Sequence, residues 1–128
     1  MQIKINNKSY DLNFGIRWVN LMNQKHNMNQ NGLTQGMGIN QAVASLMQYD
    51  PVGLSEIILN ATWINKDRPT AADIDNYLDT KADIYQLCNN ILHEIETANA
   101  TKAQVKNVLK TMKQARVKAM SKNSEKFA

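Results

Sequence analysis

Few residues of this 128-residue chain have side chains that could carry out chemistry. There is one cysteine, Cys88, and there are two histidines, His26 and His93, which together cannot supply a zinc-binding Cys/His set. The histidines are far apart in the sequence, and each lies at or near the surface of an expected helix, so we expect both to be solvent-exposed. Cys88 lies on an apolar stripe with Leu87 and Ile91, which predicts a buried, unreactive thiol rather than a nucleophile.

Two further patterns have some features of a binding site but lack others. Asp75, Asp79 and Asp83 are four residues apart, as divalent-ion ligands along a helix would be. Such rows more often keep a helix surface solvated, and a helix break near Asp79 would spoil the alignment. Residues 32–38, GLTQGMG, have the glycines of a phosphate-binding loop, but no Lys-Ser/Thr follows them and no apolar strand precedes them. The sequence therefore predicts no catalytic site, no metal site, no cofactor and no enzymatic activity.

The strongest candidate for a binding site is the basic C-terminal segment. Residues 67–96 hold seven acidic and two basic side chains, whereas residues 101–128 hold one acidic and eight basic side chains. The two segments therefore carry net charges of −5 and +7. The bases recur at spacings of three and four residues, on a helix face separate from the apolar positions. We call Lys106, Lys110, Lys113 and Arg116 the basic face and treat it as the candidate partner-binding site.

Three roles fit the basic face. It could follow a nucleic-acid phosphate backbone, it could contact an acidic protein surface, or it could simply be solvated. The acidic surface could be residues 67–96 of this chain or of a neighbouring copy. No aromatic residue lies among the lysines, so single-stranded nucleic acid would find no stacking platform. The residues alone leave the three roles open and favour a protein partner over nucleic acid.

The elements that would position these residues belong to one domain, residues 1–128. With 43% hydrophobic and 20% charged residues, the chain is long enough for one sizeable core but not for two. It has no apolar run of about 18 residues, so no membrane-spanning helix is expected. The N-terminus lacks the apolar core of a signal peptide, so export is not expected. The single cysteine fits a reducing cytoplasm.

Residues 1–14 have the pattern of a β-hairpin. Apolar and polar residues alternate on both sides of Asn6 and Asn7, and asparagine tolerates the positive φ that a two-residue type I′ turn requires. This turn would pair Ile3 with Tyr10 and place the apolar residues of both strands on one face. A lone hairpin is only marginally stable, so this one must pack on helices or pair with another chain. We expect it to be the only β element.

The remaining segments have helical periodicity. The first helix covers about residues 15–26, and residues 27–38, with three glycines and no periodicity, form the longest loop. A second helix ends before Asp50. A third begins there, because Asp50 can cap the first turn and Pro51 fits the first helical position.

Three capping-box patterns begin at Thr70, Thr80 and Thr101, and they predict either three separate helices or a long helix broken near Asp79. The helical body is thus expected over residues 15–121. After it the chain is polar, and residues 122–128 are expected to be a disordered tail. The predicted fold is mainly α, with a short N-terminal β-hairpin packed on about five or six helices.

The expected core comes from apolar residues at helical spacing. Trp18 and Trp63 are expected in or near the core. The two C-terminal stripes are expected to bury Ile84, Leu87, Ile91, Val105, Leu109 and Met112.

Several segments resemble, in order, those of a known family. They are IKINNKSYDLNFGIRW, the glycine-rich NGLTQGMG, the run DPVGLSEIILNATW and the segment RPTAADIDNYLD. In this order they resemble the tail assembly chaperones of long-tailed bacteriophages that infect Gram-positive bacteria. The resemblance covers about residues 1–80 and rests on pattern and order. Asn6-Asn7, where Asn-Gly would be expected, is a departure that affects only the strength of the turn.

The resemblance implies a small, mainly helical, non-enzymatic protein made in the cytoplasm of the infected cell. Such chaperones hold the tape measure protein, help recruit tail tube subunits, and are absent from the finished virion. The implied partners are therefore the tape measure protein and the tail tube protein. Self-association could supply the repeating surface that a long helical client needs. No catalytic motif is carried over, and a small nucleic-acid-binding protein that uses the basic C-terminal helix is the alternative.

Overall fold

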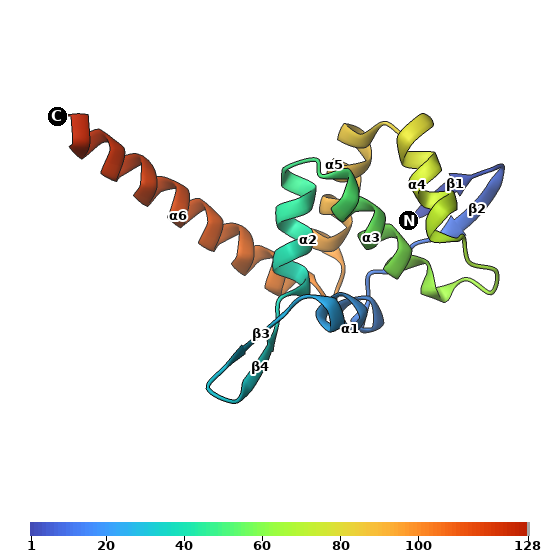
Figure 1. Ribbon diagram of the computed structural model, residues 1–128, viewed down its shortest axis with the longest axis horizontal. Helices are drawn as coiled ribbons and strands as arrows, with labels where there is room; N and C mark the ends of the chain where they lie inside the picture. Colours follow the sequence, from blue (N-terminus) through green and yellow to red (C-terminus); the bar gives the residue numbers. More distant parts are fainter. Residues whose placement is uncertain (128) are drawn as a thin grey trace.

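The computed structural model describes the backbone of residues 1–127 and the side chains of residues 1–121. A small helical body carries two β-hairpins and one long helix that extends away from it (Figure 1). The strands are β1 Gln2–Ile5, β2 Lys8–Asp11, β3 Asn27–Gln30 and β4 Leu33–Gly36. The helices are α1 Ile16–Lys25, α2 Gly38–Met47, α3 Pro51–Ala61, the short 3-10 helix η1 Thr62–Ile64, α4 Ala71–Thr80, α5 Ile84–Thr97 and α6 Lys102–Phe127. The mainly α prediction is confirmed.

The N-terminal hairpin, β1 and β2, forms as the sequence predicts. Ile3 pairs with Tyr10, and the two turn residues have φ values of 53° and 64°, as a type I′ turn requires. The apolar side chains of its inner face are buried against the helical body. The outer strand is also held by Asn65, whose side chain accepts a hydrogen bond from the Asp11 N–H and donates one to the Asp11 carbonyl.

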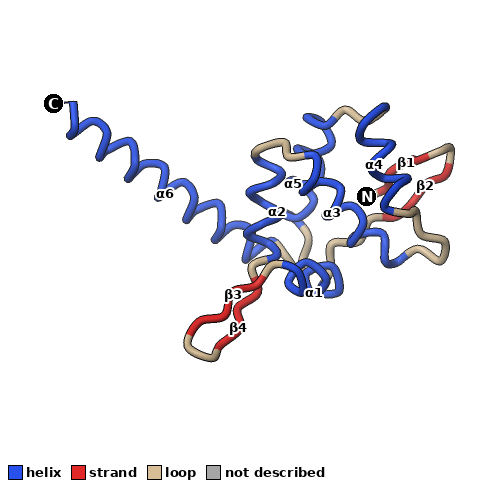
Figure 2. Tube along the Cα trace, viewed as in Figure 1, coloured by secondary structure: helices blue, strands red, loops and turns tan. Residues whose placement is uncertain are grey.

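A second hairpin, β3 and β4, occupies the segment expected to be a loop, so the prediction of only one β element is wrong (Figure 2). Its turn is Asn31-Gly32, with φ values of 53° and 78°. Asn-Gly is a strong signal for a two-residue turn, but the flanking residues do not alternate between apolar and polar. Alternation is absent because neither face of this hairpin is buried, and only a buried face requires apolar residues at every second position.

The centre of the body is helix α2, which packs against α1, α3, α5 and α6. Helix α3 begins as predicted, with the Asp50 carboxylate accepting a hydrogen bond from the Val52 N–H at 3.0 Å. α2 and α3 approach closely at Gly53, where an added Cβ would lie 2.3 Å from the Ser45 hydroxyl oxygen. Trp18 of α1 is fully buried, and its indole N–H donates to a backbone carbonyl of α3, that of Ile57, at 3.1 Å.

In the second half, helices begin after Thr70 and Thr101 as predicted, but α5 begins at Ile84 rather than after Thr80. The capping boxes predicted at Thr80 and Thr101 do not form. Thr70 caps α4 with a complete capping box. Helix α5, in contrast, is capped by the Asp83 carboxylate, while the Thr80 hydroxyl donates back into α4. The hydroxyl of Thr101 is buried and donates to the Ile95 carbonyl at 2.7 Å, which fixes the corner between α5 and α6.

The predicted C-terminal core is only partly correct. Ile91 and Val105 are fully buried, but the other four predicted residues, Ile84, Leu87, Leu109 and Met112, are only partly buried. The reason for the last two is that α6 leaves the body after its first three turns. The expected tail, residues 122–128, lies outside the residues whose side chains the structure describes, and the α6 backbone continues to Phe127.

Candidate protein-binding surface

Helix α6 consists of an inner half that packs and an outer half that does not. Val105 and Val108 are buried, because the inner half lies against α2 and α5. From residue 113 to residue 121, every described side chain is exposed. We call residues 113–121 the α6 arm. Figure 1 shows the helix extending beyond the body over more than half of its length. A helix of 26 residues is about 39 Å long, so the arm reaches well past the body.

The basic face extends along both halves of α6. Its four members are exposed, and at about 100° per residue they fall within an arc of about 120° around the helix axis. The same arc contains Val117 and Met120, which are 58% and 62% exposed. The bases were predicted from the sequence as a binding surface, but these two apolar residues were not. The arm therefore presents a mixed surface in which apolar side chains lie between positive charges.

The positive charges of α6 are not neutralised within the described part of the molecule. Among residues 1–121 the structure has one ion pair, Lys8 with Asp67, and one close contact between a histidine and a carboxylate, His26 with Glu56. Neither includes a residue of α6. The acidic side chains of residues 67–96 lie mainly on α4 and at the end of α5. The acidic segment of the same chain is thus not the ion-pair partner of the basic face.

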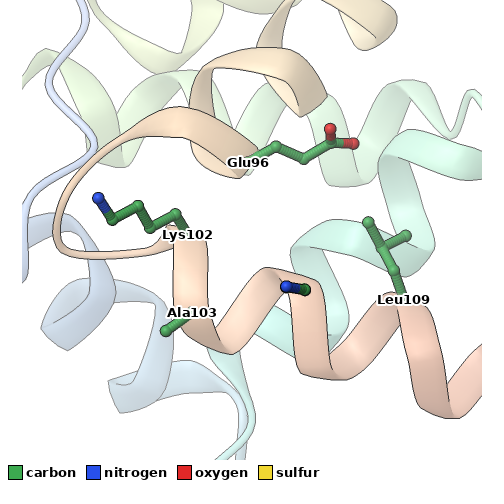
Figure 3. Close-up of a pocket in the computed structure, with 5 residues that line it drawn as sticks. Glu96, Lys102, Ala103 and Leu109 are labelled. Carbon is green, nitrogen blue, oxygen red and sulfur yellow. The ribbon is translucent and has the colours of Figure 1, made fainter.

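An open groove lies where α5 ends and α6 begins (Figure 3). Glu96 lines one side, and Lys102, Ala103, Lys106 and Leu109 of α6 line the other. Figure 3 shows the Glu96 and Leu109 side chains extending into the same space between the two helices. The groove joins the basic face to a partly buried apolar side chain, so a partner seated on the basic face would also meet an apolar surface here.

The residues with reactive side chains are not assembled into a site. Cys88 is buried, and burial raises the pKa of its thiol, with a further rise from the Asp50 carboxylate. His93 is exposed, as predicted. The prediction for His26 is wrong, because its Nε2 lies 2.7 Å from the Glu56 carboxylate and its side chain is only 25% exposed. This pair fastens the end of α1 to α3.

The row of aspartates does not form either. Asp75 accepts a hydrogen bond from the Ser55 hydroxyl, Asp79 is exposed, and Asp83 caps the next helix across the break between α4 and α5. In residues 1–121, no three His, Cys, Asp or Glu side chains are grouped so that they could hold a metal ion. The glycine-rich residues 32–38 form β4 and the start of α2.

Four aromatic residues differ in how well their environment was predicted. The prediction for the tryptophans is confirmed in part, since Trp18 is in the core while Trp63 is only half-buried in η1. Tyr49 and Tyr85, which were not predicted as a pair from the sequence, have ring centroids 4.9 Å apart and are 38% and 64% exposed. They come from different elements, and no sequence signal links them.

The fold and this surface define a mainly helical protein that presents an extended, charged helix. No helix within residues 1–127 has both the length and the hydrophobicity needed to cross a bilayer.

A family model described as phage tail assembly chaperone protein, TAC, matches residues 2–110, so the chain belongs to this family. The match covers the body and the inner half of α6, and it ends before the α6 arm. Comparison with curated proteins and with solved structures found no match.

Proposed function

We propose that this phage tail assembly chaperone is a non-enzymatic protein that holds the tape measure protein, and helps recruit tail tube subunits, in the host cytoplasm. It would leave the assembly before the virion is finished. Membership of the chaperone family supports the general role. The observation that carries the specific proposal is the α6 arm, on which every described side chain is exposed.

The arm is physically suited to binding another helix. Most helical stability in proteins comes from packing an apolar face, and the arm has no such packing within its own chain. Val117 and Met120 would supply apolar contact area to a helical client. The surrounding bases would mainly orient the client, since an exposed ion pair contributes only about 0–1 kcal/mol. A long helical protein such as the tape measure protein offers the extended surface that this arrangement requires.

The test is charge reversal of the basic face. Lys106, Lys110, Lys113 and Arg116 are all changed to Glu, and the variant is co-expressed with the tape measure protein of the same phage. Each change removes one positive charge and adds one negative charge, so four changes take the net charge from +4 to −4. We expect co-purification of the tape measure protein to be lost, and higher salt to weaken the wild-type complex moderately.

A control variant makes the same change in net charge elsewhere. It replaces four exposed bases of the body, Lys4, Arg17, Lys25 and Lys66, by Glu. We expect this variant to keep the tape measure protein. Equal loss in both variants would show a dependence on net charge alone and would refute the proposed surface.

Two other outcomes would identify a different partner for the basic face. If reversal weakens self-association but leaves tape measure binding intact, the basic face contacts the acidic residues 67–96 of a neighbouring copy. If the purified wild-type protein stays monomeric and binds random-sequence DNA with a steep salt dependence, the nucleic-acid alternative is correct. Under the proposal, DNA binding is negligible at physiological salt.

A further inference from the structure

The β3–β4 hairpin extends from the body as a free two-stranded ribbon (Figure 2). Seven of its eight strand residues are exposed, and Gly36 at its base is half-buried. Met28 and Leu33 are 48% and 75% exposed, and the strand register places both side chains on the same face. An isolated two-stranded hairpin is only marginally stable in water, so this ribbon lacks the packing that hairpins normally need.

The base of the ribbon is nevertheless held firmly. The Asn23 side chain accepts a hydrogen bond from the Gly38 N–H at 2.8 Å, and the Met37 N–H donates to the His26 carbonyl at 2.8 Å. Gly36 packs so closely on Asn23 that an added Cβ would lie 2.4 Å from its amide group. The ribbon therefore leaves the body in one fixed direction.

Both edges of the ribbon carry unpaired backbone groups. The His26–Met37 bond sets the phase of the ladder, because bonded and non-bonded pairs alternate in an antiparallel ribbon. Asn29 and Thr34 form a non-bonded pair, so their N–H and C=O groups point outward, one set on each edge. On the N-terminal hairpin, by contrast, the corresponding groups of Asp11 are bonded to the Asn65 side chain.

The ribbon also lacks the side chains that normally protect exposed edges. Natural edge strands are blunted by charges, especially lysine, by proline or by bulges. The N-terminal hairpin has Lys4, Lys8 and Asp11 in its strands, whereas residues 27–49 contain no charged residue and no proline. In a chain that is 20% charged, this uncharged segment comprises α2 and the β3–β4 hairpin. Of the two hairpins within residues 1–121, β3–β4 is the one whose strands are exposed on both faces.

We infer that the β3–β4 ribbon is a self-association surface, on which the ribbon of a second copy pairs edge to edge to form a four-stranded antiparallel sheet. When the twofold axis passes beside Thr34 of the β4 edge, or beside Asn29 of the β3 edge, that residue lies opposite its own copy. Like charges in that position would repel, while amides and hydroxyls can hydrogen-bond to their own kind. The Asn, Gln and Thr residues of the ribbon meet this condition. A charged partner would find no opposite charge here.

The experiment places a charge on each edge in turn. Thr34→Lys and Thr34→Glu alter the β4 edge, Asn29→Lys and Asn29→Glu alter the β3 edge, and Thr34→Gln and Asn29→Gln are uncharged controls. Self-association is measured by sedimentation velocity over a range of concentrations. We expect the Lys and Glu variants of the pairing edge each to associate about fivefold or more weakly than wild type, and the Gln variants to associate normally.

Mixing the variants gives the decisive measurement. An equimolar mixture of the Lys and Glu variants of the pairing edge should regain association, because opposite charges then face each other. Restoration on either edge supports the inference. It is overturned if wild-type protein stays monomeric at the highest soluble concentration, if no variant differs from wild type, or if mixing restores nothing. The first of these results would point to a strand of a different protein as the occupant. None of these results depends on the basic face, so the inference and the proposed function can fail separately.

Discussion

The two halves of α6 can be compared with one chemical change made twelve residues apart. Val105→Ala and Val117→Ala remove the same atoms from the same helix, but Val105 is 0% exposed and Val117 is 58% exposed. At about 0.8 kcal/mol per buried CH₂, plus a cavity term, the first change should lower the free energy of unfolding by about 1.5–2.5 kcal/mol. The second should leave it unchanged or raise it by up to about 0.5 kcal/mol, since alanine favours the helix.

The assay for this prediction combines urea unfolding, followed by the fluorescence of the tryptophans, with binding of the tape measure protein. For a chain of this size, the Val105→Ala cost corresponds to a Tm lower by about 5–12 °C. Val117→Ala should keep the Tm but weaken binding of the tape measure protein. A stability loss in Val117→Ala as large as that in Val105→Ala would show that the arm packs on the body. Unchanged binding would show that the arm does not contact the client.

Three further predictions concern α5. Ile91→Ala should lower the free energy of unfolding by about 2–5 kcal/mol, and Leu87→Ala by about half as much, because Ile91 is fully buried and Leu87 is only partly buried. Equal losses of stability for the two variants in urea unfolding would contradict this packing. Burial raises the pKa of the Cys88 thiol, so the unfolded chain releases this proton at lower pH than the folded chain does. The stability that this pKa shift contributes is present below the unfolded-state pKa and is lost as the pH rises through the folded-state pKa. Because the Cys88 thiol is buried, its labelling in the native protein should be slow until the protein opens. Replacing Cys88 by Val and His93 by Gln should leave tail assembly intact in a phage complementation test. Loss of assembly with the fold preserved would support an enzymatic role for these residues.

The two hairpins show what the sequence could and could not predict. The first was predictable because one of its faces is buried, and burial imposes alternation on residues 1–14. The second has neither face buried, so its strands carry no alternation, and only Asn31-Gly32 marked the turn. A turn signal without flanking alternation is weak evidence. Exposure of both faces removed the alternation that would have predicted the β3–β4 hairpin, and the same exposure makes it available as the proposed self-association surface.

The α6 helix shows a second limit. Its apolar spacing correctly predicted a helix with one packed face, but periodicity does not reveal where the packing partner ends. Val108 is buried against the body, while Ala119, about three turns further along on the same side of the helix, is exposed. The basic face could be read from the sequence because charges are explicit. The exposure of Val117 and Met120 required the structure, because the sequence does not show that this part of α6 lacks a packing partner among the described residues.

The two projections have opposite chemistry, and this separates their expected responses to salt. The α6 arm combines bases with two exposed apolar residues, so its contacts depend partly on charges that salt screens over about 10 Å at 0.1 M and about 3 Å at 1 M. The ribbon has no charged side chain, and its pairing would rest on backbone hydrogen bonds. Raising the salt concentration from about 0.1 M to about 1 M should therefore weaken tape measure binding moderately and leave self-association unchanged. One chain could then remain assembled with its own copies while its hold on the client is adjusted independently, because no charge is shared between the two surfaces.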